Sequence, residues 1–268
     1  MDLDPKYSSA VSRRPGPREH IRCDEGDVAE YVLLPGDPGR VPVIAEHLDD
    51  ARHVASSREY TTYTGTLDGT PVTITSTGIG GPSTAIAIEE LVQLGARTLI
   101  RIGTCGAIHP DAHVGELIIA TGAVRDDGTT RQYAPIAHPA VASPDVVHAL
   151  HDAASSRGFK HHVGVVHTTD SFYAQHEPDR MPIATKLTNR DATLRSLGVL
   201  CSEMETATVF IVGGSVLGRR VGSVLAIAGN RTGGEHLDSP EMITRRDQAV
   251  QKAIIAAVEA VRFLAAQG

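Results

Sequence analysis

Four short segments of the chain combine glycine or apolar residues with charged and hydroxyl side chains, a pattern suited to binding an anion or a sugar. The first runs Gly36-Asp37-Pro38-Gly39-Arg40. Glycines allow backbone amides to approach an anion closely, and the guanidinium of Arg40 presents a planar fork of donors that matches phosphate. An ordinary turn with a surface arginine is the alternative for this segment.

The second segment, Arg101-Ile102-Gly103-Thr104-Cys105-Gly106, places an arginine inside an apolar strand. A buried guanidinium is costly unless an anion pairs with it, so Arg101 predicts either a bound phosphate or an internal carboxylate. Thr104 and the glycines add hydroxyl and amide donors. We interpret Cys105 as a small buried residue and not as a nucleophile, because the sequence positions no histidine to activate it.

The third and fourth segments are Glu203-Met204-Glu205 and Ala228-Gly229-Asn230-Arg231-Thr232. Glu205 can accept hydrogen bonds from two neighbouring sugar hydroxyls, and Met204 offers an apolar surface to a sugar ring. Helix capping is the alternative for the acidic pair, since carboxylates favour the first turn of a helix. The fourth segment is a strand end followed by a loop, and alone it indicates only a surface turn.

Alternating strands and helices are expected to position these segments. Short apolar or β-branched runs predict strands at residues 31–34, 60–67, 71–77, 98–102, 115–124, 163–169, 199–202 and 221–228. Helices are predicted over 41–48, from an opening segment at 78–83 to a stop at Gly95, over 144–158 and 204–217, and from 240 onward. Asp68-Gly69 predicts a hairpin, and residues 170–190 predict a long irregular loop. Ligands of α/β sheets bind beyond the carboxyl ends of strands, where these four segments begin.

The composition excludes several classes of protein. The chain has 268 residues, a formal net charge of −7, no tryptophan and three cysteines. The negative charge gives no general attraction to nucleic acid, and no apolar run approaches the roughly 18–20 residues of a membrane span. Cys23, Cys105 and Cys201 are far apart, which indicates neither a zinc site nor a disulfide framework. We expect a cytoplasmic protein with one α/β domain over residues 20–268 and a mobile leader over residues 1–19.

Seven segments in order resemble the nucleoside phosphorylase superfamily, and its uridine phosphorylase branch most closely. They are 32–38, 57–62, 76–83, 101–104, 170–173, 203–205 and 230–232. The resemblance implies a single-domain, three-layer α/β/α fold with a central mixed, partly barrel-like sheet. It also implies a pentosyltransferase that uses inorganic phosphate and no organic cofactor. The enzyme would be a homo-oligomer, at least a dimer with shared sites and expected to be a hexamer built as a trimer of dimers.

Carried over residue by residue, the resemblance implies three adjoining subsites and a cation site. Phosphate would contact Gly36, Arg40, Arg58, Arg101 and Thr104, with Arg58 supplied by a neighbouring subunit. Ribose would contact His20, Glu203, Met204 and Glu205, with His20 from that same neighbour. The base would contact Thr104, Cys105, Gly106, Phe172, Gln175, Ala228 and Gly229. Arg101, Glu205 and Arg231 would be catalytic, and Glu59, Ile79 and Ser83 would hold a monovalent cation, typically potassium.

Departures from the family pattern leave the base open. The segment Ala228-Gly229-Asn230-Arg231 lacks the aspartate of purine-cleaving relatives, and its first two residues replace larger aliphatic ones, which enlarges the base pocket. The arginine that reads uracil is absent two residues after Gln175, although Arg180 or His176 could substitute.

A pyrimidine nucleoside of the uridine type is the favoured substrate, cleaved to free base and ribose or deoxyribose 1-phosphate. A purine or modified nucleoside is the first alternative. A hydrolytic nucleosidase is disfavoured, because water as the nucleophile needs no cluster of arginines. A nucleoside-binding protein without activity is the last alternative.

Overall fold

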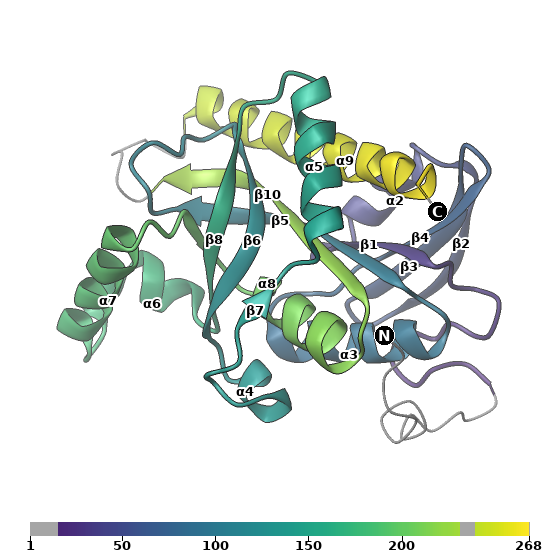
Figure 1. The fold of residues 1–268 in the computed structure, drawn as a ribbon. Coiled ribbons are helices and arrows are strands. Elements are labelled where there is room, and N and C mark those ends of the chain that lie inside the picture. Colours follow the sequence, from purple (N-terminus) through teal and green to yellow (C-terminus); the bar gives the residue numbers. More distant parts are fainter. Residues whose placement is uncertain (1–15, 231–238, 268) are drawn as a thin grey trace.

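One ten-stranded sheet organises the computed structural model, which describes residues 16–230 and 239–267 (Figure 1). The strands are β1 (Tyr31–Pro35), β2 (Asp49–Ser57), β3 (Tyr60–Leu67), β4 (Thr70–Thr75), β5 (Thr98–Ala107), β6 (Leu117–Asp126), β7 (Ala140–Val141), β8 (His161–Thr169), β9 (Cys201–Glu203) and β10 (Arg220–Asn230). Their order is β10-β6-β8-β9-β5-β1-β4-β3-β2, and β7 pairs with β6. Because β10 also pairs with β5, the first five strands of this order close into a barrel. The predicted mixed, partly barrel-like sheet is confirmed.

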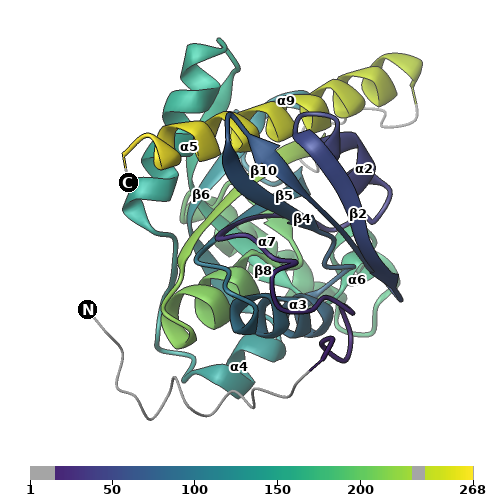
Figure 2. The same cartoon turned by 90° about the vertical axis from the view of Figure 1, so that its right-hand side faces the viewer.

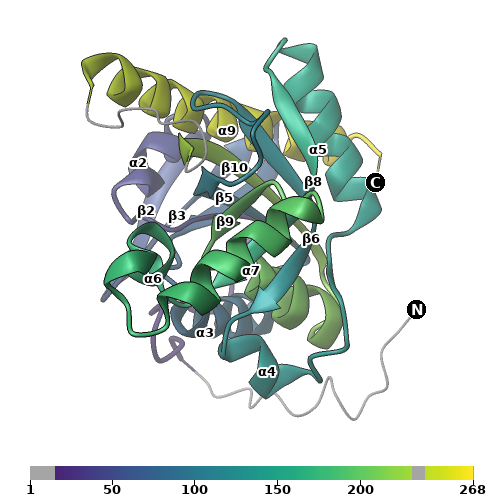
Figure 3. The ribbon, with the colours of Figure 1, turned by 90° about the vertical axis from the view of Figure 1, so that its left-hand side faces the viewer.

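Helices cover both faces of the sheet and one side of the barrel. The first face carries α2 (Arg40–Ala45), α5 (Pro144–Ser156) and α9 (Pro240–Ala265) (Figure 2). The opposite face carries α3 (Gly81–Gln93), α4 (Thr129–Tyr133), α8 (Thr206–Thr208) and the π-helix η2 (Val209–Val216). Beside β8 and β9 lie α6 (Phe172–His176), the 3-10 helix η1 (Pro178–Arg180) and α7 (Ala184–Ser196) (Figure 3). A separate buried apolar cluster on each face of the sheet completes the predicted three-layer arrangement.

The hairpin between β3 and β4 turns where the sequence predicts it. Asp68 and Gly69 have φ angles of 51° and 81°, as both central residues of a tight hairpin turn require.

The strand that begins at Thr98 continues to Ala107, five residues beyond its predicted end. Position 103 in this strand requires glycine. A β-carbon there would lie 2.6 Å from Nη2 of Arg101, and only glycine leaves room for the guanidinium.

The prediction of an irregular loop over residues 170–190 is wrong, because this segment contains α6, η1 and the first half of α7. Helix α7 buries only Leu187 and Leu194 and exposes polar residues on its remaining faces. Two buried positions give too weak an apolar period to mark a helix in the sequence.

Smaller differences concern caps and exposed strands. Ser143 stands at the N-cap of α5, but its hydroxyl accepts from the amide of Val221 at 2.9 Å and not from a helix amide. Strand β2 is missed because most of it is exposed and lacks a two-residue apolar period.

Of the predicted leader, residues 1–15 lie outside the described residues. Arg18 is 5% exposed, and its amide donates to the carbonyl of Cys23 at 2.8 Å, so this part packs on the domain.

Candidate active site

The carboxyl ends of β1 and β5 bring the first two predicted segments together. In the parallel register Leu34 lies beside Arg101, and Pro35 lies beside Ile102. The Gly36 turn therefore follows β1 at the level where Thr104 continues β5. The amide of Gly78 donates to the carbonyl of Gly36 at 2.9 Å, which joins a third glycine-containing turn to the same edge.

Arg101 is the centre of a buried ion network. Its side chain is 4% exposed; Nε donates to Glu203 at 3.1 Å, and Nη2 donates to Glu205 at 2.5 Å. Burial works against the guanidinium charge, but Glu205 and then Glu203 hold the pKa of Arg101 above its ordinary value. The sequence predicted either a bound phosphate or an internal carboxylate as the partner of Arg101, and the structure shows two internal carboxylates. Within the described residues Nη1 donates no hydrogen bond, so one edge of the fork remains for an anion.

Arg40, at the start of α2, is close enough to Arg101 for their charges to interact. Burial, together with the positive charges of Arg101 and Arg246, lowers the pKa of Arg40, while Asp37 acts in the opposite direction. Guanidinium groups that disfavour one another's charge are stabilised by an anion placed between them. Arg246, on α9, was not singled out in the sequence, because a charged residue on an amphipathic helix ordinarily marks a solvent-exposed face.

Glu205 links the arginine network to the turn before α3. Its Oε1 accepts the amide of Gly80 at 2.6 Å, and its Oε2 accepts from Arg101. Burial raises the pKa of Glu205 despite the opposing effect of Arg101. Glu203 is engaged differently, because it accepts from Arg101, from the hydroxyl of Thr168 and from the amides of residues 205 and 206. These bonds hold Glu203 in a capping and positioning arrangement.

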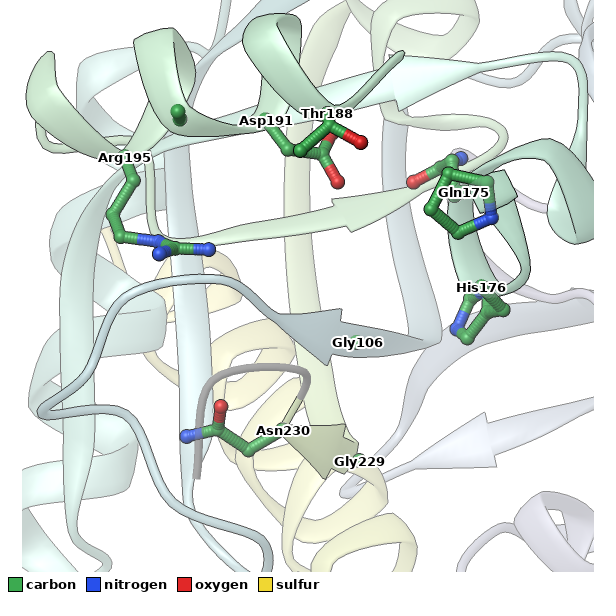
Figure 4. Close-up of a pocket in the computed structure, with 10 residues that line it drawn as sticks. Gly106, Gln175, His176, Thr188, Asp191, Arg195, Gly229 and Asn230 are labelled. Carbon is green, nitrogen blue, oxygen red and sulfur yellow. The ribbon is translucent and has the colours of Figure 1, made fainter. Parts of the chain in front are cut away.

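A cavity of about 420 Å³ opens beside the ends of β5 and β10 (Figure 4). Gly106 and Gly229 are paired in register there, and a bulge between Ile227 and Gly229 displaces Ala228. The lining includes three of the predicted base-site residues, Gly106, Gln175 and Gly229. The other four, Thr104, Cys105, Phe172 and Ala228, are not part of its lining.

The far wall of the cavity comes from α7, which contributes polar side chains that the sequence did not indicate. They are Thr188, Asp191 and Arg195, and they face Gly106 and Asn230 across the cavity (Figure 4). Nε of Arg195 donates to the carbonyl of Ile108 at 3.1 Å, which holds this side chain against β5. Without a recognised helix in this part of the chain, no sequence signal could have placed these residues beside the base site.

Helix α7 is anchored to the barrel through Asp126 at the end of β6. Arg190 donates to Asp126 at 2.7 Å, and the same oxygen lies 3.1 Å from Nε2 of the fully buried His167. The other ring nitrogen of His167 lies 2.8 Å from the hydroxyl of Ser202. The hydrogen bond from His167, and then the charges of His167 and Arg190, lower the pKa of Asp126 against the effect of its burial.

We expect Asp126→Asn to lower the melting temperature at neutral pH and to have no effect at acidic pH. A carboxyl whose folded-state pKa is depressed stabilises the fold above its unfolded value of about 3.9 and loses that contribution as pH falls through the folded value. Melting temperatures of both proteins from pH 7 down to pH 2.5 test this. Asp152→Asn, at an exposed position of α5, is the control. A difference that grows as pH falls would contradict the assignment.

The other predicted residues that the structure describes lie outside the hydrogen bonds of Arg101 and outside the cavity lining. His20, in the segment before β1, packs against α3, and its Nδ1 lies 2.6 Å from Oε1 of Glu90. Arg58 is exposed on the turn before β3 with a φ of 54°. The three predicted cation ligands, Glu59, Ile79 and Ser83, lie close to Gly78. A β-carbon built on Gly78 would lie 2.6 Å from Cγ of Glu59 and 3.3 Å from Oγ of Ser83. The hydroxyl of Ser83 donates to the carbonyl of Ile79 at 3.2 Å. Arg231 lies outside the described residues.

A family model described as "Phosphorylase superfamily" matches residues 30–262. The chain therefore belongs to the phosphorylase superfamily. It is 46% identical over 248 residues to a uridine phosphorylase of Treponema pallidum, covering 92% of this chain and 94% of that protein. A guanosine phosphorylase of Halorubrum lacusprofundi is 40% identical over 248 residues, 91% of this chain and 98% of that one. The crystal structure of uridine phosphorylase from Vibrio fischeri, complexed with 6-hydroxy-1-naphthoic acid, superposes with a TM-score of 0.83 at 34% identity, covering 92% of this chain and 96% of that one.

No helix within residues 16–230 and 239–267 has the length and apolar character needed to cross a membrane.

Proposed function

We propose that the protein is a nucleoside phosphorylase that cleaves the N-glycosidic bond of a uridine-like pyrimidine nucleoside with inorganic phosphate. The products are the free base and ribose or deoxyribose 1-phosphate. The observation that carries the proposal is the juxtaposition of Arg40, Arg101 and Glu205 at one sheet edge, next to the cavity between β5, β10 and α7. The 46% identity to a uridine phosphorylase supports the pyrimidine assignment.

In this proposal phosphorolysis uses arginine and carboxylate side chains and needs no organic cofactor. Breaking the bond between C1′ and the base makes the sugar cation-like, and phosphate on one face both stabilises that charge and attacks it. Arg40 and Nη1 of Arg101 would position the phosphate, so that orientation and preorganised charge lower the barrier. Glu205 would accept from the ribose hydroxyls, with Met204 against the sugar, and its charge favours the developing cation. The base would then occupy the cavity.

A phosphate-dependent turnover screen tests this proposal directly. The panel is uridine, thymidine, cytidine, inosine and adenosine, each with phosphate, with arsenate and with neither. We expect uridine or thymidine to be cleaved only when phosphate or arsenate is present. Cleavage that persists after phosphate is removed would instead identify a hydrolytic nucleosidase, and tight nucleoside binding without turnover would identify a binding protein.

Phosphorolysis of a purine or modified nucleoside is the second candidate. The cavity extends from Gly106 to the polar wall of α7, and the small residues Ala228 and Gly229 stand at the end of β10. The 40% identity to a guanosine phosphorylase points the same way. In the same screen, inosine turnover that exceeds uridine turnover would favour this candidate.

We further propose a shared active site in a homo-oligomer, arranged as a hexamer. Arg58 on its exposed turn and His20, which is bound to Glu90 of α3, would then complete the phosphate and ribose subsites of a neighbouring chain. The oxygens of Glu59, Ile79 and Ser83 suit a hard monovalent cation such as potassium, which takes oxygen ligands. Free, buried Cys23, Cys105 and Cys201 are consistent with a cytoplasmic enzyme of nucleoside salvage.

A further inference from the structure

His176, the last residue of α6, reaches the floor of the base cavity. It is among the residues that line the cavity, and a β-carbon built on Gly106 would lie 3.4 Å from its Nε2 atom. Figure 4 shows the ring beside Gly106 and next to Gln175. The neighbouring Gln175 donates one N–H of its side-chain amide to the carbonyl of Ser171, the N-cap of α6, at 3.3 Å.

The ring of His176 is held in one orientation. It stacks on Phe172 with ring centroids 4.0 Å apart and an interplanar angle of 15°. Its Nδ1 lies 2.9 Å from the main-chain carbonyl of Phe172. The start of α6 is itself secured, because the hydroxyl of Ser171 accepts the amide of Ala174 at 3.2 Å. A base-reading group needs such support to discriminate between ligands.

This contact decides the tautomer. A carbonyl oxygen can only accept, so Nδ1 must carry the proton that it shares with Phe172. In the neutral imidazole the other nitrogen is then an acceptor, and Nε2 presents a lone pair to the cavity above Gly106. An acceptor fixed at Nε2 can bind a base whose ring nitrogen carries a hydrogen. When the ring nitrogen of the base has no hydrogen, two lone pairs face each other and no hydrogen bond forms.

We propose that His176 is a specificity-determining residue that accepts a hydrogen bond from a ring N–H of the base, so that the site selects bases with an N–H next to a carbonyl. This inference rests on the proposed function. Uracil, thymine and hypoxanthine have that N–H, whereas cytosine and adenine present an unprotonated ring nitrogen at the corresponding position. His176 is exposed in the open cavity, and a bound base would cover it. A site built to hydrogen-bond a substrate group rejects analogues that lack it, because the covered partner is then left unpaired.

Methylated nucleosides test the proposal, because one methyl group removes the N–H. We would measure kcat/KM at pH 8 for uridine against 3-methyluridine and for inosine against 1-methylinosine. The variants are His176→Leu and His176→Gln, the second of which keeps an acceptor oxygen near the position of Nε2. His138→Gln, outside the cavity lining, is the matched control.

The wild type should prefer the unmethylated partner of the cleaved pair by at least about 100-fold. His176→Leu should reduce this preference at least about tenfold, mainly by slowing the unmethylated substrate, and His176→Gln should restore part of it. Equal cleavage of both partners by the wild type, or an equal loss for both in His176→Leu, would overturn the proposal.

The outcome is separable from that of the proposed function. If inosine alone is cleaved, the pyrimidine assignment fails, but the inosine pair still tests His176. If no nucleoside is cleaved, calorimetric binding of uridine and 3-methyluridine to the wild type and to His176→Leu replaces kcat/KM. Equal affinity of the wild type for the two ligands would again overturn the role of His176.

Discussion

Replacing Arg101 with alanine should reduce kcat/KM about 100- to 1,000-fold, equivalent to about 3–4 kcal/mol of transition-state stabilisation. The guanidinium is preorganised by Glu203 and Glu205, so its Nη1 edge is already directed when phosphate arrives. Charge held in place before the reaction costs no reorganisation at the transition state, which is why its loss reduces the rate so strongly. Initial rates at varied phosphate and nucleoside concentrations measure the effect. A variant within about twofold of wild type would contradict the phosphate assignment.

The same substitution should also destabilise the fold. It leaves Glu203 and Glu205 buried without their cation, and breaking a buried ion pair costs about 3–5 kcal/mol. Activity must therefore be compared well below the melting temperature of the variant. Arg220→Ala provides a matched control, because it removes a partly exposed arginine that pairs with Asp145 at 2.7 Å. That loss should cost less than about 1 kcal/mol and leave kcat/KM unchanged.

Much of the sheet could be predicted from local pattern. The strand at Tyr31 and the hairpin at Asp68-Gly69 are specified by residues close in sequence, because an apolar run and a turn dipeptide each act locally. Closure of the barrel is different: it depends on β10 pairing with both β5 and β6, which are far from it in the chain. No local pattern encodes that pairing, and only the resemblance to a family indicated it.

The phosphate end of the site was easier to predict than the base end. An arginine in a strand of apolar residues must have an anionic partner, so Arg101 stands out from its neighbours alone. By contrast, Asp191 and Arg195 look in the sequence like ordinary charged residues of a polar helix, and nothing local distinguishes them from solubilising charges. Their place beside Gly106 follows from the anchoring of α7 to Asp126, a contact between residues 64 positions apart.

Glu205→Gln should reduce activity far more than stability. The side-chain oxygen of the new glutamine can still accept from the main-chain N–H of Gly80, and Arg101 keeps Glu203 as a partner. The free energy of unfolding should therefore fall by only about 1–3 kcal/mol. For a domain of this size that corresponds to a fall in melting temperature of only several degrees. The reaction, however, loses a negative charge beside a cation-like sugar and an acceptor for its hydroxyls. We therefore expect kcat/KM to fall at least about 100-fold.

Glu203→Gln is the control that makes this result specific. Glu203 accepts from Arg101, Thr168 and the amides of residues 205 and 206, so its replacement removes more internal bonds than the replacement of Glu205 does. We expect Glu203→Gln to have the lower melting temperature of the two variants, measured by calorimetry under one set of conditions. The opposite order, with Glu205→Gln unfolding first and retaining activity while folded, would show that Glu205 serves the fold. The negative charge beside the sugar would then have to come from another residue.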